Sequence, residues 1–387
     1  MFTQTPPVSR RAETRPARPG LLRQAAGLVE AALTPHGVDS YVELIAPTWS
    51  SREVRARITE ARRTTPGSVT LTLRPNRTWA GFTAGQHTQL TVEIDGVRHT
   101  RCYSLVGSQH DRSGTIELTV KAHPEGLVSQ HLVTRARRGM VVGLTAAQGE
   151  FTLTEARPEH TLLISGGSGI TPVLSMLRTL CDEGHDHPVT FLHYSLTAGA
   201  MPYRNELALL AAQHPNVRVV RVFTDEPGTG DLPAELGAFL TPEQLDAADP
   251  GWRDAEAYVC GPAPLMGAAV EAFTVAGRAE HVHTEAFTLP GFAGARPAGD
   301  TAVAGGSVRF AASDLEVTDD GRPILLQAED AGLRPQSGCR MGICHTCTRH
   351  LHSGAVRNAV TGEVTTGPES EIRICLSVPV GDVAVDL

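Results

Sequence analysis

Three cysteines lie within ten residues near the end of the 387-residue chain, in the stretch GCRMGICHTC that runs from Gly338 to Cys347. Cys339, Cys344 and Cys347 have C-x4-C-x2-C spacing, and Cys375 follows after a further 27 residues. A tight loop with small residues lets three thiolates converge on one side of a compact cluster, and a distant strand supplies the fourth. This is the spacing of plant-type [2Fe–2S] sites, so the four cysteines are predicted to ligate such a cluster.

Other uses of these thiols are weighed against the cluster. Cys344 and Cys347, with His350 close by, have zinc-like spacing, but structural zinc usually shows two separated pairs of ligands. A Rieske centre requires two histidine ligands at suitable spacing, and no second Cys–His pair provides them. Disulfides do not suit the reducing compartment predicted below. Metal binding by a [2Fe–2S] cluster is therefore favoured.

A glycine-rich turn in LLISGGSGITP has the composition of a phosphate site. Gly166, Gly167 and Gly169 carry no side chains where a backbone would have to approach a pyrophosphate, and Pro172 suits the first turn of a helix. The string is not a G-x-G-x-x-G fingerprint. It nevertheless predicts a nucleotide site between a buried strand and a helix.

A third chemically suggestive stretch is RCYSL. The Arg101 guanidinium could fork onto a phosphate, the Tyr103 ring could lie against a flat cofactor, and the Ser104 hydroxyl could reach the edge of that cofactor. Alone, this tetrapeptide is a weak signal.

The elements that must position these residues fall into distinct segments. From Arg52 to about Phe151 the pattern alternates as in SVTLTLRP and TIELTVKAH, which predicts a small antiparallel barrel. Short apolar strands then alternate with helical runs, which predicts a parallel, doubly wound sheet. Residues 289–306 are rich in Gly, Pro and Ala and are predicted to form a linker.

Together these motifs resemble the bacterial flavin-dependent ferredoxin reductases that carry a C-terminal plant-type [2Fe–2S] domain and serve fatty-acid desaturases, epoxidases and ring-hydroxylating oxygenases. The resemblance implies a multidomain fold: an antiparallel β-barrel flavin domain, an α/β parallel-sheet nucleotide domain and an α+β β-grasp ferredoxin domain. The expected boundaries are 1–51 for an N-terminal helical extension, 52–156 for the FAD-binding barrel, 157–288 for the NAD(P)-binding domain, 289–306 for the linker and 307–387 for the ferredoxin domain.

The resemblance also implies roles for individual residues. Tyr103, Ser104 and Cys260 are expected to be catalytic, with Cys260 in YVCGP near the nicotinamide. The remaining residues are expected to bind flavin or nicotinamide; they are Arg101, Lys121, Gly126, Ser129, Gly166, Gly167, Gly169, Thr171, Pro172, Gly261, Pro262, Glu285 and Phe287.

The implied activity is that of an NAD(P)H:ferredoxin-type oxidoreductase. Hydride passes from NADPH or NADH to FAD, with FAD favoured over FMN, and single electrons then pass through the [2Fe–2S] cluster to a separate oxygenase, desaturase or haem monooxygenase. The choice between NADH and NADPH stays open: Ser195, Thr197, Tyr203 and Arg204 could cradle a 2′-phosphate. One alternative is a self-contained reductase of quinones, ferric ions or oxygen. A more distant alternative is a redox-sensing iron–sulfur or zinc interaction protein.

Composition limits the partners. The net charge is −8 and no basic block is present, which argues against nucleic acid. No stretch approaches the roughly 18 apolar residues of a membrane span. Ser9-Arg10-Arg11 is not followed by the apolar segment of an export signal. A cytoplasmic, monomeric electron-transport protein without an integral membrane segment is therefore expected.

Overall fold

The computed structural model describes residue 48 and residues 53–124, 126–287, 306–338, 342, 346–359, 362–368 and 370–387. By internal contacts the chain divides into Met1–Ser51 and Arg52–Leu387. The predicted N-terminal helical extension, apart from Thr48, and the predicted linker, apart from Gly306, lie outside the described residues. No helix within the described ranges is long and apolar enough to cross a membrane.

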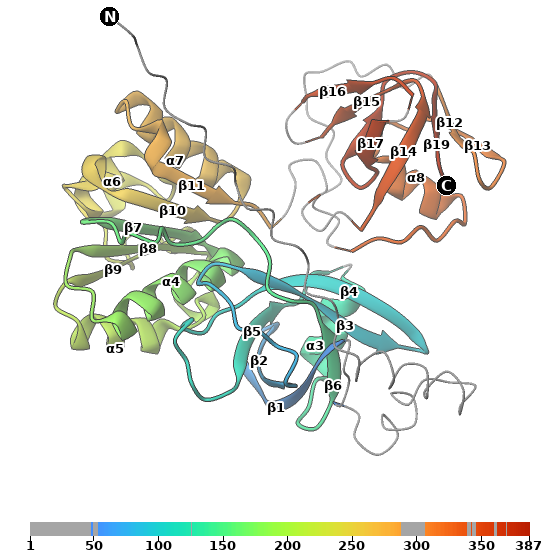
Figure 1. Ribbon diagram of the computed structural model, residues 1–387. Helices are drawn as coiled ribbons and strands as arrows, with labels where there is room; N and C mark the ends of the chain where they lie inside the picture. The colour runs from blue at the N-terminus through green and yellow to red at the C-terminus, as the bar shows by residue number, and fades with distance from the viewer. Residues whose placement is uncertain are drawn as a thin grey trace, which may run out of the picture. The chain divides into compact units, whose positions relative to one another are not determined.

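Residues 53–153, called the barrel here, form one six-stranded antiparallel sheet in the order β4-β3-β6-β1-β2-β5 (Figure 1). A bridge between Leu105, directly after β4, and Leu118 in β5 brings the two edge strands together and rolls the sheet up. Alternating apolar residues, including fully buried Ile58, Leu71 and Leu90, fill its interior. The elements are β1 (Val54–Thr65), β2 (Ser68–Pro75), β3 (His87–Ile94), β4 (Val97–Ser104), β5 (Ile116–Lys121), α3 (Leu127–Arg135) and β6 (Val141–Leu144).

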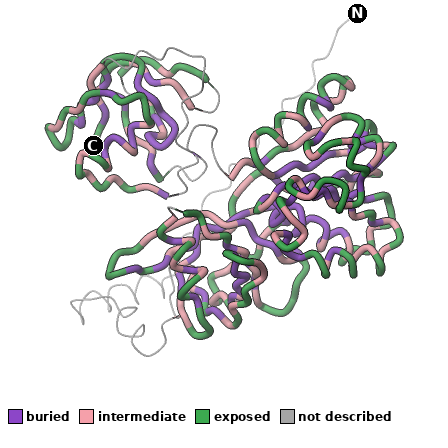
Figure 2. Tube along the Cα trace, turned by 180° about the vertical axis from the view of Figure 1, so that it is seen from behind, coloured by how far each residue is buried: buried purple, intermediate pink, exposed green. Residues whose placement is uncertain are grey.

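Residues 154–287, called the central domain, form a five-stranded parallel sheet in the order β11-β10-β7-β8-β9. Helices cover both faces, so β7 and β8 are buried along their whole length (Figure 2). The elements are β7 (Thr161–Gly166), α4 (Ile170–Glu183), β8 (Val189–Ser195), α5 (Arg204–Gln213), β9 (Val217–Phe223), α6 (Pro242–Ala248), β10 (Glu256–Cys260), α7 (Ala263–Val275) and β11 (Val282–Glu285).

The described residues between 306 and 387, called the C-terminal domain, combine a five-stranded mixed sheet, β13-β12-β19-β14-β17, with a three-stranded sheet, β16-β15-β18, and one helix. Phe310, Ile324, Leu325 and Leu351 are fully buried in its core. The elements are β12 (Ser307–Phe310), β13 (Leu315–Thr318), α8 (Ile324–Asp330), β14 (Thr348–Ser353), β15 (Ala355–Asn358), β16 (Val364–Thr366), β17 (Ser370–Arg373), β18 (Ser377–Pro379) and β19 (Val383–Val385).

Candidate functional site

A cavity of about 160 Å³ opens where the barrel meets the central domain. It is called the barrel cavity here. Six residues that the sequence singled out contribute to it, namely Tyr103, Ser104, Lys121, Thr171, Glu285 and Phe287. The full lining is His87, Cys102, Tyr103, Ser104, Thr119, Lys121, Ser168, Thr171, Glu285 and Phe287.

Tyr103 and Ser104 lie beside this cavity because β4 ends there. They end β4, where antiparallel pairing with β3 sets Thr88 opposite Tyr103 and His87 opposite Ser104. Burial raises the pKa of Tyr103 above its ordinary value, so its phenol stays protonated and presents a neutral ring.

Three buried polar atoms around the barrel cavity have no hydrogen-bond partner among the residues the structure describes: Ser104 Oγ, His87 Nε2 and Glu285 Oε2. The other side of the His87 ring approaches Glu285, with Nδ1 at 3.6 Å from Oε1. Orphaned buried polar atoms are rare because each costs desolvation free energy. A flat ring system with donors and acceptors at its edge, as in a flavin, would satisfy them, so the residues fit that group.

His87 is a functional candidate that sequence reasoning missed. It begins β3 in the stretch HTQLTVEI, where a histidine looks like any half-buried strand residue. Only its pairing opposite Ser104 reveals its place beside the cavity.

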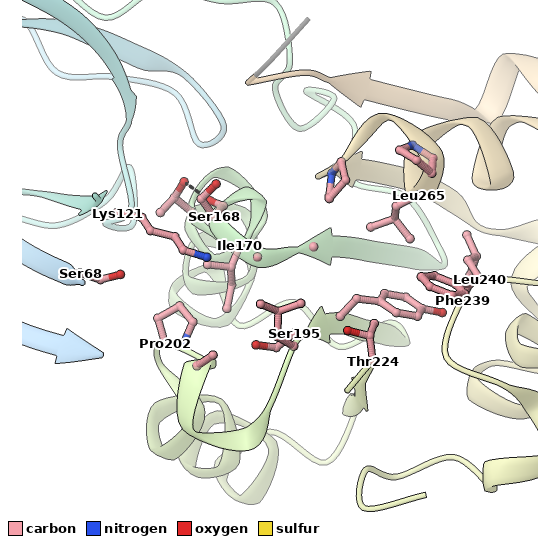
Figure 3. A pocket seen from close by; sticks show the side chains of 18 of the residues that line it. Ser68, Lys121, Ser168, Ile170, Ser195, Pro202, Thr224, Phe239, Leu240 and Leu265 are labelled. Atoms are coloured by element: carbon pink, nitrogen blue, oxygen red, sulfur yellow. Dashed lines mark hydrogen bonds between the residues drawn. The ribbon is translucent and has the colours of Figure 1, made fainter. Parts of the chain in front are cut away.

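A larger cavity of about 430 Å³, called the central cavity, lies along the carboxyl ends of the central strands. It shares Thr119, Lys121, Ser168 and Thr171 with the barrel cavity. In Figure 3 the Lys121 side chain points into this space. The complete lining is Ser68, Thr119, Lys121, Gly166, Gly167, Ser168, Ile170, Thr171, Tyr194, Ser195, Leu196, Ala200, Pro202, Thr224, Phe239, Leu240, Pro262, Pro264, Leu265 and Ala268.

Two backbone turns pack against each other at the floor of this region. A Cβ atom on Gly169 would lie 2.1 Å from the carbonyl oxygen of Cys260, and one on Gly166 would lie 2.7 Å from Cδ of Pro262. The reverse also holds, because a Cβ atom on Gly261 would lie 2.9 Å from the Gly166 nitrogen. These glycines therefore permit close contact between the turns after β7 and β10. The sequence pattern did not reveal this reason for glycine at these positions.

The same packing presents the start of α4 to the central cavity. Gly169 precedes the helix and supplies no side-chain cap, so the first N–H groups of α4 are not satisfied by a capping side chain. Pro172 lies in the first turn, as expected, and the Thr171 hydroxyl donates to the Ser168 carbonyl at 3.1 Å. A 3-10 turn over Gly167–Gly169 leads into α4, and its carbonyls accept from the Ile170 N–H, so it is the dipole of the helix that suits a phosphate or pyrophosphate here.

Cys260 lies behind the barrel cavity and does not line it. It ends β10, pairs in register with Glu285 on β11 and is fully buried. Burial, and then the nearby Glu285 carboxylate, raise the pKa of the Cys260 thiol well above its ordinary value. The group is therefore held as a neutral thiol, and its predicted place near the nicotinamide stays a prediction.

Three predicted flavin residues line neither cavity. The Arg101 side chain donates to the Thr100 carbonyl at 2.8 Å. Ser129 Oγ accepts from the His123 N–H and donates to the Gly126 carbonyl, each at 3.0 Å. Gly126 precedes α3, and a Cβ atom there would lie only 2.3 Å from Ser129 Oγ. Their predicted contact with a flavin pyrophosphate stays a prediction.

Two of the four predicted cluster ligands are described, and both are buried: Cys347 is 1% exposed and Cys375 is 0% exposed. Their segments meet, since the Ile374 N–H donates to the Cys347 carbonyl at 3.3 Å and Arg373 Nη1 donates to the Gly342 carbonyl at 2.6 Å. Cys339 and Cys344 lie outside the described residues. Buried thiols on two segments that meet are the donors that an iron–sulfur cluster takes.

Models of three protein families match the chain in order: an oxidoreductase FAD-binding domain at residues 57–153, an oxidoreductase NAD-binding domain at 163–271 and a 2Fe-2S iron-sulfur cluster binding domain at 311–380. The fold and the two cavities therefore define an oxidoreductase with flavin, nicotinamide and iron–sulfur domains. The predicted multidomain fold class and the predicted cofactors, FAD, [2Fe–2S] and NAD(P)H, are confirmed at this level.

The chain is 36% identical over 370 residues to the NADPH oxidoreductase of Mycobacterium tuberculosis, covering 95% of this chain and 92% of that protein. It is 29% identical to the glycine betaine monooxygenase reductase subunit of Pseudomonas aeruginosa, covering 79% of this chain and 87% of that one. The structure of phthalate dioxygenase reductase shares the fold, with a TM-score of 0.60 and 23% identity over 86% of this chain and 97% of that one. The chain belongs to this family of flavin-dependent, [2Fe–2S]-containing oxidoreductases, which confirms the resemblance seen in the sequence.

Proposed function

We propose that this protein takes two electrons from NAD(P)H as a hydride and delivers them one at a time to a separate oxygenase or desaturase. The observation that carries the proposal is the shared wall of the two cavities, where Thr119, Lys121, Ser168 and Thr171 border both. A coenzyme in the central cavity and a flavin in the barrel cavity would meet at that wall.

The residues of the barrel cavity would orient the flavin. Bound flavin supplies the ability to accept electrons as a pair and to release them singly, which a one-electron cluster requires. The Ser104 hydroxyl has a free donor for the ring edge, and the Tyr103 ring offers a flat apolar surface. His87 and Glu285 lie next to each other, and their buried atoms without partners, His87 Nε2 and Glu285 Oε2, would hydrogen-bond that edge.

Lys121 would hold the coenzyme or flavin phosphates. It is the single lysine among 34 lysine and arginine residues, and it borders both cavities. A mobile ammonium facing two phosphate-bearing ligands is well suited to bind either of them.

The far end of the central cavity bears on whether the protein uses NADH or NADPH. Ser195 and Thr224 line it. The Thr197 side chain accepts from the Ala200 N–H, and the Tyr203 hydroxyl is engaged by barrel residues, so these two of the four residues predicted for a 2′-phosphate are occupied elsewhere.

The proposed partner is an oxygenase, a desaturase or a haem monooxygenase. Support comes from relatives that are named as reductase subunits of a monooxygenase, as in the Pseudomonas aeruginosa protein described above and its counterpart in Chromohalobacter salexigens, which is 27% identical over 79% of this chain and 87% of that one. The domain boundaries, the monomeric state and the cytoplasmic location given above remain predictions.

A spectroscopic experiment tests the proposal. Purified protein reconstituted with FAD, iron and sulfide is titrated anaerobically with NADPH and with NADH, and flavin and cluster absorbance are followed separately. Cys344→Ser should abolish cluster reduction and leave flavin reduction by the coenzyme intact. Electron delivery is then measured with a purified diiron or haem oxygenase. Turnover with ferric ion or quinone but with neither oxygenase would support the self-contained alternative.

A further inference from the structure

A cluster of polar side chains joins the barrel to the central domain. Arg178 on α4 is held by two carboxylates from different domains. Its Nε and Nη2 bond Glu206 on α5 at 2.6 and 2.8 Å, and its Nη1 bonds Glu117 on β5 at 3.0 Å. The same Nη1 donates to the Val106 carbonyl of the barrel at 3.0 Å. One guanidinium therefore ties three elements and two domains together.

Tyr203 completes the cluster. Its ring lies under the Arg178 guanidinium, 5.3 Å from centroid to Cζ, and its hydroxyl donates to Glu117 at 3.0 Å. The hydroxyl also hydrogen-bonds Thr119 and, at 3.4 Å, Thr70 on the barrel strands. Tyr203 is 8% exposed, and burial, followed by the Glu117 carboxylate, raises its pKa. The neutral phenol is thus a permanent donor to the barrel.

The backbone at Tyr203 is held in a conformation that its side chain disfavours. Its φ is +58°, in the left-handed region where residues other than glycine are uncommon. Such a conformation persists when surrounding contacts determine it, and the bonds to Thr119 and Glu117 are those contacts. The segment 200–203 is therefore shaped by its attachment to the barrel.

The cluster lies directly behind the wall that the two cavities share. Thr119, which bonds Tyr203, borders both cavities, and Ala200 and Pro202 of the strained segment border the central cavity. Arg178 lies seven residues after Thr171 on α4, about 10 Å along the helix. Movement of the cluster would therefore be transmitted to both sides of the junction.

Directional bonds distinguish this contact from apolar packing. A forked guanidinium pair fixes orientation as well as distance, whereas apolar side chains tolerate sliding.

We propose that Arg178 and Tyr203 are positioning residues that fix the angle between the barrel and the central domain, so that the coenzyme at Thr171 faces the flavin at Ser104. The inference rests on the proposed function. It predicts that loosening the cluster slows hydride transfer while flavin and coenzyme still bind.

The test compares Arg178→Lys and Tyr203→Phe with Arg221→Lys in the full-length protein carrying FAD and cluster. Arg221 has the same forked geometry, with Nε and Nη2 each 2.7 Å from Asp231, but both residues lie within the central domain and line neither cavity described above. Lysine cannot reproduce a fork, so Arg178→Lys and Arg221→Lys each lose one. Tyr203→Phe removes only a hydroxyl, so it still tests the inference if Arg178→Lys does not fold.

Three readouts are taken. The rate of flavin reduction by NAD(P)H, measured anaerobically, is expected to fall about 10- to 100-fold in both cluster variants and not in Arg221→Lys. The long-wavelength charge-transfer absorbance of stacked nicotinamide and flavin should weaken, with FAD content unchanged. Hydrogen exchange should accelerate in residues 116–121 and 198–203 of the cluster variants but not in β7.

The outcomes distinguish failure of the inference from failure of the proposed function. Faster exchange with unchanged reduction rate and charge-transfer absorbance would show that the cluster only stabilises the fold, and would overturn the inference. Unchanged exchange together with an unchanged rate would overturn it as well. If the unmodified protein's flavin is not reduced by either coenzyme, the proposed function itself fails.

Discussion

Replacing Gly169 by alanine tests how tightly the two turns beneath the cofactor region are packed. The added Cβ would lie 2.1 Å from the carbonyl oxygen of Cys260, and real Cβ contacts are essentially never below 3.0 Å, so the turns must separate by about 0.9 Å. The obstacle is backbone on both sides, which a side-chain rotation cannot relieve. Gly169 has φ −64°, so the cost comes from the clash and not from backbone strain.

A separation of this size has two measurable consequences. Overpacking of this kind typically costs about 1–3 kcal/mol in the free energy of unfolding. A misplacement of about 1 Å between reacting groups is expected to cost about 100-fold in rate. We therefore expect Gly169→Ala to lower Tm and to slow reduction of bound flavin by NAD(P)H about 100-fold, as measured by anaerobic stopped-flow absorbance.

Gly184→Ala is the matched control at the other end of α4. Gly184 follows the helix at φ +67°, and a Cβ added there would have no atom within 4 Å, so alanine strains the backbone without moving the turns. It should lower stability by about 1–2 kcal/mol and leave the rate of flavin reduction unchanged. If Gly169→Ala reduces flavin as fast as the unmodified protein, the close packing of the turns has no bearing on cofactor alignment and the reasoning is wrong.

Three further predictions follow from described contacts. Ser104→Ala removes a buried hydroxyl that has no partner among the described residues, so it should keep the fold but slow flavin reduction about 10-fold; an unchanged rate would mean that Ser104 does not touch the flavin. Lys121→Ala should raise the coenzyme Kd about 10-fold and flatten its salt dependence, and an unaltered salt dependence in a binding titration would exclude a phosphate contact. His160 bonds Asp249 at 2.8 Å, and this bond raises the pKa of His160 above its ordinary 6.5. The stabilisation is therefore present below pH 6.5 and lost as pH rises through the raised value, so His160→Asn should lower Tm more at pH 6 than at pH 9; equal losses at both would contradict it.

Sequence reasoning found the residues whose position follows from local pattern. Tyr103 and Ser104 were singled out by the string RCYSL, and Thr171 by GGSGITP, together with the resemblance that these strings carry. Such local strings need no tertiary contact to be recognised, and all three residues line the barrel cavity. The cysteine spacing likewise needed no tertiary information.

Residues whose position depends on long-range register were missed or misassigned. His87 meets Ser104 only through the pairing of β3 with β4. Tyr203 was considered for a 2′-phosphate, but its hydroxyl is taken up by Glu117, 86 residues away. Arg178 carries no motif at all, and its contact with Glu117 spans 61 residues. Contacts across two domains leave no periodic signal in either one.

The common border of the two cavities has a thermodynamic consequence. Ligands that touch the same four side chains, Thr119, Lys121, Ser168 and Thr171, perturb each other's affinity, and linkage requires the factor to be identical in both directions. A coenzyme that lowers the Kd of the flavin would thus have its own Kd lowered by the flavin by the same factor. Oxidised coenzyme added to a purification buffer would then keep more of the flavin bound to the protein.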